Sequence, residues 1–198
     1  TIDYLKSTVR GIYKVIRNTC KEVRAKYGLG DCDMAEDIAF VTTQQLEDEY
    51  PDMTPQQREN AAAKKYGAVF IMQIGGLLKS GNKHDGRAPD YDDWSLNGDI
   101  FVDYPTIGRG LELSSMGIRV DRESLLSQLK SENALDRLEL PFHKALADGQ
   151  LPLSIGGGIG QSRLCMFILG KRHIGEVQPS IWSQRELDEC EAKGIKLL

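Results

Sequence analysis

The stretch LSIGGGIGQSRL, residues 153–164, combines residue types suited to binding an anion or a nucleotide. We predict a short strand over residues 153–155 that leads into a glycine loop, and a helix after it. Glycines let a ligand approach the backbone, and a helix start offers free N–H groups and the positive end of its dipole. Arg163, in the first helical turn, could stack on a base or contact a phosphate. The loop glycines are Gly156, Gly157, Gly158 and Gly160.

Two familiar glycine motifs do not fit this stretch. A dinucleotide-binding fingerprint that starts at Gly158 needs a sixth-position glycine, where Arg163 stands, and a phosphate-binding Walker loop needs Gly-Lys-Ser/Thr. A tight strand–helix turn with a solvent-facing arginine is the alternative. The arginine three residues after the last glycine favours a nucleotide site over that turn.

Charged residues form a second candidate site, in HDGRAPDYDDWS (residues 84–95) and in the strands predicted after it. Asp99 and Glu112 lie within predicted strands, which disfavour both residue types. Carboxylates from neighbouring strands suit a Mg²⁺–nucleotide site or a substrate ammonium, because hard cations take oxygen ligands. Arg87 and Arg119 could bind a carboxylate or a phosphate through two parallel hydrogen bonds.

The alternation of side chains along a strand sets a condition for this site. In a regular strand Ser115 and Arg119 share one face and Glu112 takes the other. A single pocket that uses all three therefore requires a bulge or a break near Ser114. The sequence leaves this point open.

The remaining acidic and aromatic residues near this region are assigned simpler roles. We expect Asp90 and Asp93 to be turn residues on a solvated loop. With Asp92 they would form an acidic loop that suits ammonium capture and repels a phosphate backbone. His143 is expected to be partly buried and structural. No pair of nucleophile and base is apparent.

The elements that must position these residues follow from hydrophobic spacing and capping residues. Apolar residues recur at three- and four-residue steps from Leu5 to Tyr27, Thr54 and Gln57 form a predicted capping box, and Asp121 is a predicted helix cap. Strands neighbour one another as often as they alternate with helices, which favours an α/β fold of the α+β type. In this fold a mainly antiparallel sheet is flanked by helices, in one domain over residues 1–198. The predicted helices are residues 5–27, 55–66, 121–130, 141–147 and 161–169. The predicted strands are residues 38–41, 68–73, 99–104, 110–120 and 153–155, with an extended segment over 174–182.

The composition and net charge of the chain indicate which kinds of partner it could bind. The chain has 198 residues, of which 40% are hydrophobic and 27% charged, and a net charge of −4. We therefore expect no nucleic-acid partner and no membrane partner. The four cysteines form no C-x-x-C pair, and the three histidines show no zinc-ligand spacing. A reduced, cytoplasmic protein fits these features.

Beyond these local patterns, long blocks of the chain resemble the ammonia-dependent asparagine synthetases, also called aspartate–ammonia ligases. They run from about Gly67 to Trp182 as GAVFIMQIGG, HDGRAPDYDDWS, LNGDI, ELSSMGIRVD, SIGGGIGQSRLCMFIL and HIGEVQPSIW. The resemblance implies a class II aminoacyl-tRNA synthetase-like core that works as a homodimer. It also implies a reaction of L-aspartate with ATP to β-aspartyl-AMP, from which ammonia displaces AMP to give L-asparagine.

The resemblance also implies roles for individual residues. Arg163 matches the arginine of class II motif 3, which packs on ATP. Asp99 and Glu112 match acidic residues of the nucleotide–Mg²⁺ and substrate site. The residues that match the aspartate and adenylate pocket are Arg87, Asp92, Ser115 and Arg119.

Two departures from the family and two rival functions stand beside this assignment. The family carries an N-terminal region with a dimerisation motif and an arginine for the α-phosphate, so this chain is expected to lack an N-terminal segment. Family members also have several more residues between the positions of Ser95 and Leu96. The rivals are a fragment of an aspartyl- or asparaginyl-tRNA synthetase and a non-catalytic regulatory paralogue. The absence of a basic stripe counts against the first, and the joint presence of Arg163, Glu112 and Asp99 counts against the second.

Overall fold

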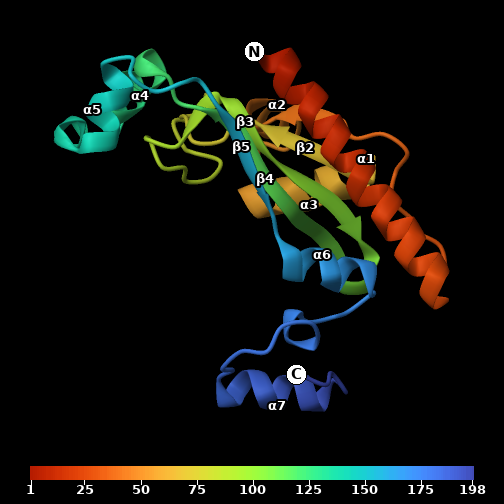
Figure 1. Ribbon diagram of the computed structural model, residues 1–198. Helices are drawn as coiled ribbons and strands as arrows, with labels where there is room; N and C mark the ends of the chain where they lie inside the picture. Colours follow the sequence, from red (N-terminus) through yellow and green to blue (C-terminus); the bar gives the residue numbers. More distant parts are fainter.

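A computed structural model describes residues 1–198 and shows a five-stranded sheet with helices on both faces (Figure 1). The strands pair in chain order, β1 and β2 in parallel and the others antiparallel. The mainly antiparallel sheet flanked by helices was predicted from the sequence and is confirmed. The strands are β1 (Ala39–Thr42), β2 (Ala68–Met72), β3 (Asp92–Tyr104), β4 (Arg109–Arg119) and β5 (Ile155–Ile159). The α-helices are α1 (Ile2–Tyr27), α2 (Thr43–Glu49), α3 (Pro55–Tyr66), α4 (Arg122–Ser131), α5 (Pro141–Ala147), α6 (Gln161–Ile168) and α7 (Gln184–Ala192), with 3₁₀ turns η1 (Pro105–Ile107), η2 (Leu135–Glu139) and η3 (Ile174–Glu176).

The long helix α1 covers one face of the sheet and builds the main core. Its buried residues recur at three- and four-residue steps, as predicted, and it ends at Gly28, whose φ of 65° is left-handed. Phe70 of β2 and Ile100 of β3 are fully buried beneath it. The buried residues that α1 contributes are Leu5, Val9, Tyr13, Ile16 and Cys20.

Helices α2 and α3 cover part of the opposite face. The predicted capping box of α3 is present, because the Thr54 side chain accepts from Gln57 N–H and the Gln57 side chain accepts from Thr54 N–H. A second core cluster lies under these helices and includes Val69 and Ile71 of β2 and Phe101 of β3. Phe101 and Asp99 are two residues apart and share a face. Beyond α3, this face of β3, β4 and β5 carries the charged residues described below.

The register of β3 against β4 resolves the question that the sequence left open. Ile100 pairs with Ser114 and Phe101 pairs with Glu112, so Leu113 is the extra residue of a β-bulge. Leu113 and Met116 both pack in the core under α1. Because of the bulge, Glu112 lies on the same face as Ser115, which pairs with Asp99.

Several predicted boundaries were wrong. The glycine cluster is not a loop after a strand over residues 153–155; it is itself the edge strand β5. Glycine is disfavoured in strands, so propensity concealed this one. Strand β3 begins at Asp92 instead of Asp99. Helices α2 and α7 were not predicted, and the segment predicted to be extended contains η3.

Helices α4 and α5 with η2 form a small lobe at one end of the sheet, and α7 lies beyond α6 near the other end (Figure 1). Asp121 caps α4, as predicted, by accepting from Ser124 N–H at 2.9 Å. Leu125, Leu129 and Leu146 give the lobe its own apolar cluster. None of the helices is both long and apolar enough to cross a membrane.

Two glycine substitutions test the packing next to the charged face. A Cβ on buried Gly98 would overlap the carbonyl of Ile71 and approach the Phe70 ring to 2.8 Å, whereas a Cβ on Gly11 of α1 meets nothing within 4 Å. We expect Gly98→Ala to lower the free energy of unfolding by about 1–3 kcal/mol or more. Gly11→Ala should raise it by about 0.5–1 kcal/mol, because alanine is the better helix former. Urea titration of both variants measures these changes, and equal effects would contradict this packing.

Candidate functional site

Three arginine–carboxylate pairs lie on the part of the sheet face that α3 leaves uncovered. Arg87, from the segment before β3, contacts both carboxylate oxygens of Asp99. Arg119 of β4 pairs with Asp92 of β3 through Nη1 and Oδ1. The third pair joins Arg163 of α6 and Glu112 of β4, Nη1 to Oε2, at 2.9 Å. The structure thus brings six of the predicted site residues onto one face, with Ser115 in register beside Asp99.

Among the carboxyl groups of the site, Asp99 has the most strongly shifted pKa. The residue is 6% exposed. Burial raises its pKa to about 6, the Arg87 guanidinium pulls the pKa down, and the Glu112 charge pushes it up. A carboxylate in this position requires a cation beside it.

The pair of Asp92 and Arg119 is fitted closely into the sheet. Burial raises the pKa of Asp92, and the Arg119 charge acts against that rise. The Arg119 guanidinium lies over the Tyr91 ring at 3.9 Å, and its Nη2 donates to the Tyr91 hydroxyl at 2.9 Å. Gly117 makes room for the carboxylate, because a Cβ there would come within 2.8 Å of its Cγ. Sequence reasoning missed Tyr91 and Gly117, although a glycine inside a strand signals close approach.

Three of the four glycines lie in β5, where they point to different faces of the sheet, and the fourth begins α6. A Cβ on Gly156 would collide with the Arg119 guanidinium, whereas Gly158 faces open space. Gly157 turns toward α1, where a Cβ would meet Met116. Gly160 is the N-cap of α6. Gly156 and Gly158 therefore lie on the charged face and Gly157 does not.

The pair of Arg163 and Glu112 separates two polar hollows. Their side chains are 46% and 34% exposed. The larger hollow, about 330 Å³, is lined by Ser115, Gly158, Gly160 and Gln178, among others. The smaller one, about 240 Å³, contains Asp99 and Arg109 and reaches α3 at Gln56 and Asn60. Both hollows offer hydrogen-bond donors and acceptors for a polar, charged ligand.

The donor set at Asp99 and Glu112 fits a hard cation. Both are carboxylates on one face of neighbouring strands, and Mg²⁺ is commonly bound by one or two carboxylates together with substrate phosphates. No group of three or more His, Cys, Asp or Glu side chains is placed to hold a metal ion. Substrate oxygens would have to complete the coordination of such an ion.

The acidic loop differs from the prediction. Asp90 lies in a turn, as predicted, but its side chain is not solvated: its Oδ2 accepts from Arg137 Nη1 at 2.9 Å and lies 2.8 Å from His143 Nε2. Asp93 was also predicted to be a turn residue, but it lies in β3, where its Oδ1 accepts from Ser95 N–H at 2.8 Å. His143 is buried in α5, as predicted. Asp90 and Asp92 both have cationic or histidine partners, so of the three carboxylates expected to capture ammonium only Asp93 has no ion pair.

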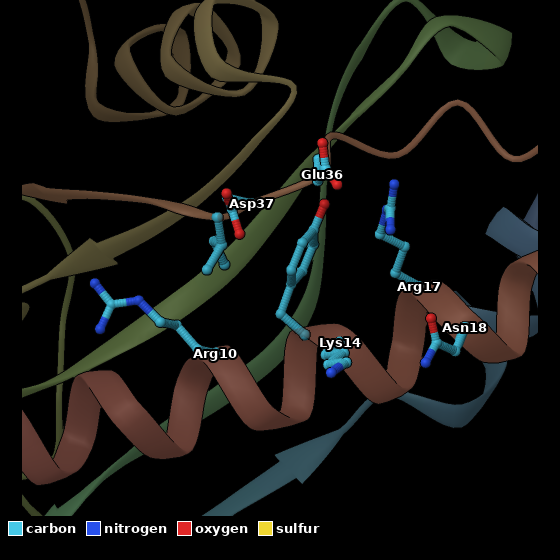
Figure 2. A pocket seen from close by; sticks show the side chains of 8 residues that line it. Arg10, Lys14, Arg17, Asn18, Glu36 and Asp37 are labelled. Carbon is cyan, nitrogen blue, oxygen red and sulfur yellow. The ribbon is translucent and has the colours of Figure 1, made fainter.

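A separate hollow of about 280 Å³ lies between α1 and the segment before β1 (Figure 2). Figure 2 shows Arg10, Lys14 and Arg17 side by side along α1, with Glu36 and Asp37 on the facing segment. With Lys6 and Lys21 at the same helical spacing, these cations form a basic stripe. The expectation of no basic stripe was wrong, because the net charge of the whole chain conceals it.

Comparisons with known proteins agree on one family. The family model described as aspartate-ammonia ligase matches residues 1–194. A protein of Fusobacterium nucleatum named aspartate–ammonia ligase is 58% identical over 196 residues, which are 99% of this chain and 60% of that protein. A protein of Levilactobacillus brevis with the same name is 56% identical over 198 residues, 100% of this chain and 59% of its own length. The chain therefore spans about 60% of the length of these relatives.

Solved structures show the fold. An Entamoeba histolytica asparaginyl-tRNA synthetase in complex with asparaginyl-adenylate aligns with a TM-score of 0.61 at 14% identity, over 90% of this chain and 44% of that one. The aspartyl-tRNA synthetase of the same organism aligns with a TM-score of 0.52 at 18% identity, over 80% of this chain and 34% of that one. The sheet and its helices thus have the fold of these synthetases, as predicted.

The raised pKa of Asp99 predicts a stability change with pH. Because its pKa is 3.8 in the unfolded reference and about 6 in the fold, the native state binds the proton more tightly. Its contribution to the free energy of unfolding is complete below pH 3.8 and is lost as the pH rises through 6. Denaturant titrations at pH 4 and pH 7 measure this loss. The free energy of unfolding should fall between these pH values by about 2–3 kcal/mol more in wild type than in Asp99→Asn, since one pKa unit corresponds to roughly 1.4 kcal/mol.

Asp121 supplies a control of opposite sign for this titration. Hydrogen bonds from Ser124 lower the pKa of Asp121, so its contribution is present at neutral pH and is lost on acidification. The free energy of unfolding of Asp121→Asn should therefore still fall between pH 4 and 7, as it does in wild type. A fall of the same size in Asp99→Asn would contradict the assignment to Asp99.

Proposed function

The chain belongs to the aspartate–ammonia ligase family, and from that premise we propose that the protein converts L-aspartate and ammonia to L-asparagine. The reaction uses ATP, passes through β-aspartyl-AMP and releases AMP and pyrophosphate. Since the chain spans about 60% of its relatives, the proposal concerns the whole protein. The observation that carries it is the set of three arginine–carboxylate pairs on one uncovered sheet face.

Arg163 and the start of α6 are the proposed nucleotide-binding elements. Arg163 lies in the first turn of α6 beside Gly158 and Gly160, where the backbone can approach a ligand. A planar guanidinium can stack on a base or neutralise phosphate, and free N–H groups at a helix start favour anions. Asp99 and Glu112 would hold Mg²⁺, which would neutralise part of the phosphate charge. Of the four predicted glycines, Gly158 and Gly160 are proposed to border the nucleotide, whereas Gly156 approaches Arg119 and Gly157 faces α1.

The proposed aspartate pocket lies at the other end of the same face. Arg87 and Arg119 are planar cations that can bind a carboxylate through two hydrogen bonds, and Asp92 can accept from the substrate ammonium. Ser115 adds a hydroxyl between this end and Glu112. In this arrangement the β-carboxylate would point toward the nucleotide site, as adenylation requires.

Aminolysis of the adenylate then depends on position. Neutral ammonia is a competent nucleophile once it lies beside an activated acyl carbon, so a general base is not essential. The protein is proposed to act as a homodimer in the cytoplasm, and the four free cysteines support a reducing setting. Residues 1–198 are proposed to form one catalytic domain.

The nucleophile separates this function from that of a tRNA synthetase. We expect the complete protein, given aspartate, ATP, Mg²⁺ and ammonium, to form asparagine and AMP in equal amounts. The rate should rise with pH as the fraction of neutral ammonia grows, and EDTA should abolish it. Quantifying both products, with tRNA added in a parallel reaction, is the measurement. AMP release that needs tRNA and ignores ammonium would overturn the proposal.

Arg163 is expected to contribute to turnover and little to stability, because its side chain is half exposed. Arg163→Ala should lower kcat/KM for ATP by about 10- to 100-fold or more, the loss of roughly 1–3 kcal/mol of transition-state binding. Its circular dichroism spectrum and melting temperature should match those of wild type. Arg185→Ala, on the exposed face of α7, is the matched control and should retain full activity. Near wild-type kcat/KM in Arg163→Ala would remove this role.

A further inference from the structure

Gln128 of α4 is buried and binds the backbone of a segment outside its own lobe. Its Nε2 donates to the carbonyls of Pro89 at 2.9 Å and Asp92 at 3.1 Å. Its Oε1 accepts from the N–H of Trp94 at 2.8 Å. The residue is 6% exposed, so these bonds have little competition from water. One amide group thereby ties down both sides of Asp92.

The segment held in this way carries one member of each of two site arginine–carboxylate pairs. Arg87 lies two residues before Pro89, and Asp92 lies between the two ends that Gln128 binds. Tyr91, whose hydroxyl and ring meet Arg119, also accepts from Val120 N–H through its carbonyl at 3.0 Å. The backbone position of residues 87–94 therefore sets where Arg87 and Asp92 meet their partners.

The same lobe binds the segment at a second point. Asp90 contacts Arg137 of η2 and His143 of α5, both through Oδ2. Gln128 of α4 and these two residues of η2 and α5 therefore bind the segment at separate points. The lobe has its own apolar cluster and can act as a rigid support for it.

We propose that Gln128 is a positioning residue for the aspartate pocket, and that the α4–α5 lobe sets substrate affinity by fixing residues 87–94. This inference rests on the proposed function. It assigns Gln128 no contact with substrate. Its effect passes through the backbone to Arg87 and Asp92. Aspartate binding therefore depends on Gln128 more strongly than nucleotide binding does, because Arg87 reaches the nucleotide end only through Asp99.

The chemistry of the amide explains why glutamine stands at this position. Two carbonyls require a donor and one N–H requires an acceptor, and only a primary amide of this length supplies both. Glutamate has the same shape, but its ionised carboxylate would face two carbonyl oxygens. Methionine has nearly the same volume and no donor. Leu125 and Leu129 beside it already supply the apolar packing of α4.

The test compares Gln128→Met and Gln128→Glu with wild type in the complete protein. We expect KM for aspartate to rise about 10-fold or more in both variants, while KM for ATP stays within about twofold. Gln184→Glu, on the exposed first turn of α7, is the control and should change neither constant. Equal rises in both KM values, or no rise in either, would overturn the inference.

Hydrogen exchange separates this inference from the proposed function. The Trp94 amide should exchange about 10-fold faster or more in Gln128→Met, because its acceptor is gone, and amides in β2 should be unaffected. Unchanged exchange over residues 87–94 would overturn the inference whatever the activity. A wild-type protein that makes no asparagine overturns only the proposed function. Should Gln128→Met fail to fold, Gln128→Glu carries the comparison of KM values, and Gln128→Leu, which also lacks the acceptor for Trp94 N–H, carries the exchange measurement.

Discussion

Carboxylates held out of water need a cation beside them, and the whole charged face follows from this constraint. Asp92 and Asp99 are 4% and 6% exposed. An ionised group buried to this degree is strongly destabilising unless it is paired. Arg119 comes from the strand next to Asp92, and the pair needs only space on the sheet face. Gly117 and Gly156 leave this space because they have no side chain. Arg87 comes from an irregular segment, so that segment must be fixed by bonds from outside the sheet.

The register of the sheet decides which charges share this face. A regular β4 would direct Glu112 into the apolar layer under α1, where a lone carboxylate has no partner. The bulge at Leu113 instead sends an apolar side chain into that layer and returns Glu112 to the polar face. Helix α6 follows β5 directly, so Arg163 emerges where Glu112 can reach it. One extra residue in β4 thus joins the two halves of the candidate site.

The sequence predicted the elements with strong periodic or capping signals, and failed where tertiary pairing overrides propensity. The spacing of α1, the capping box of α3 and the cap of α4 are local and were predicted correctly. The edge strand of glycines is stabilised by its pairing with β4 and by the close approach of Arg119, which no local pattern reveals. For the site, residue types identified the carboxylates and arginines. Their pairing, the bulge, and the roles of Tyr91 and Asp90 depend on residues far apart in the chain.

The same charge constraint limits how substrates can enter. Each buried carboxylate already has an arginine partner, and removing one partner of a buried pair costs about 3–5 kcal/mol. Asp99 can therefore release Arg87 only when another cation takes its place, and Arg87 can leave only for another anion. A zwitterionic amino acid and a metal–nucleotide complex bring both kinds of charge together. In the function proposed here, binding exchanges partners without leaving any buried charge unpaired. The half-exposed pair of Arg163 and Glu112 should open at the least cost, so in the proposed function the exchange would begin at the nucleotide end of the face.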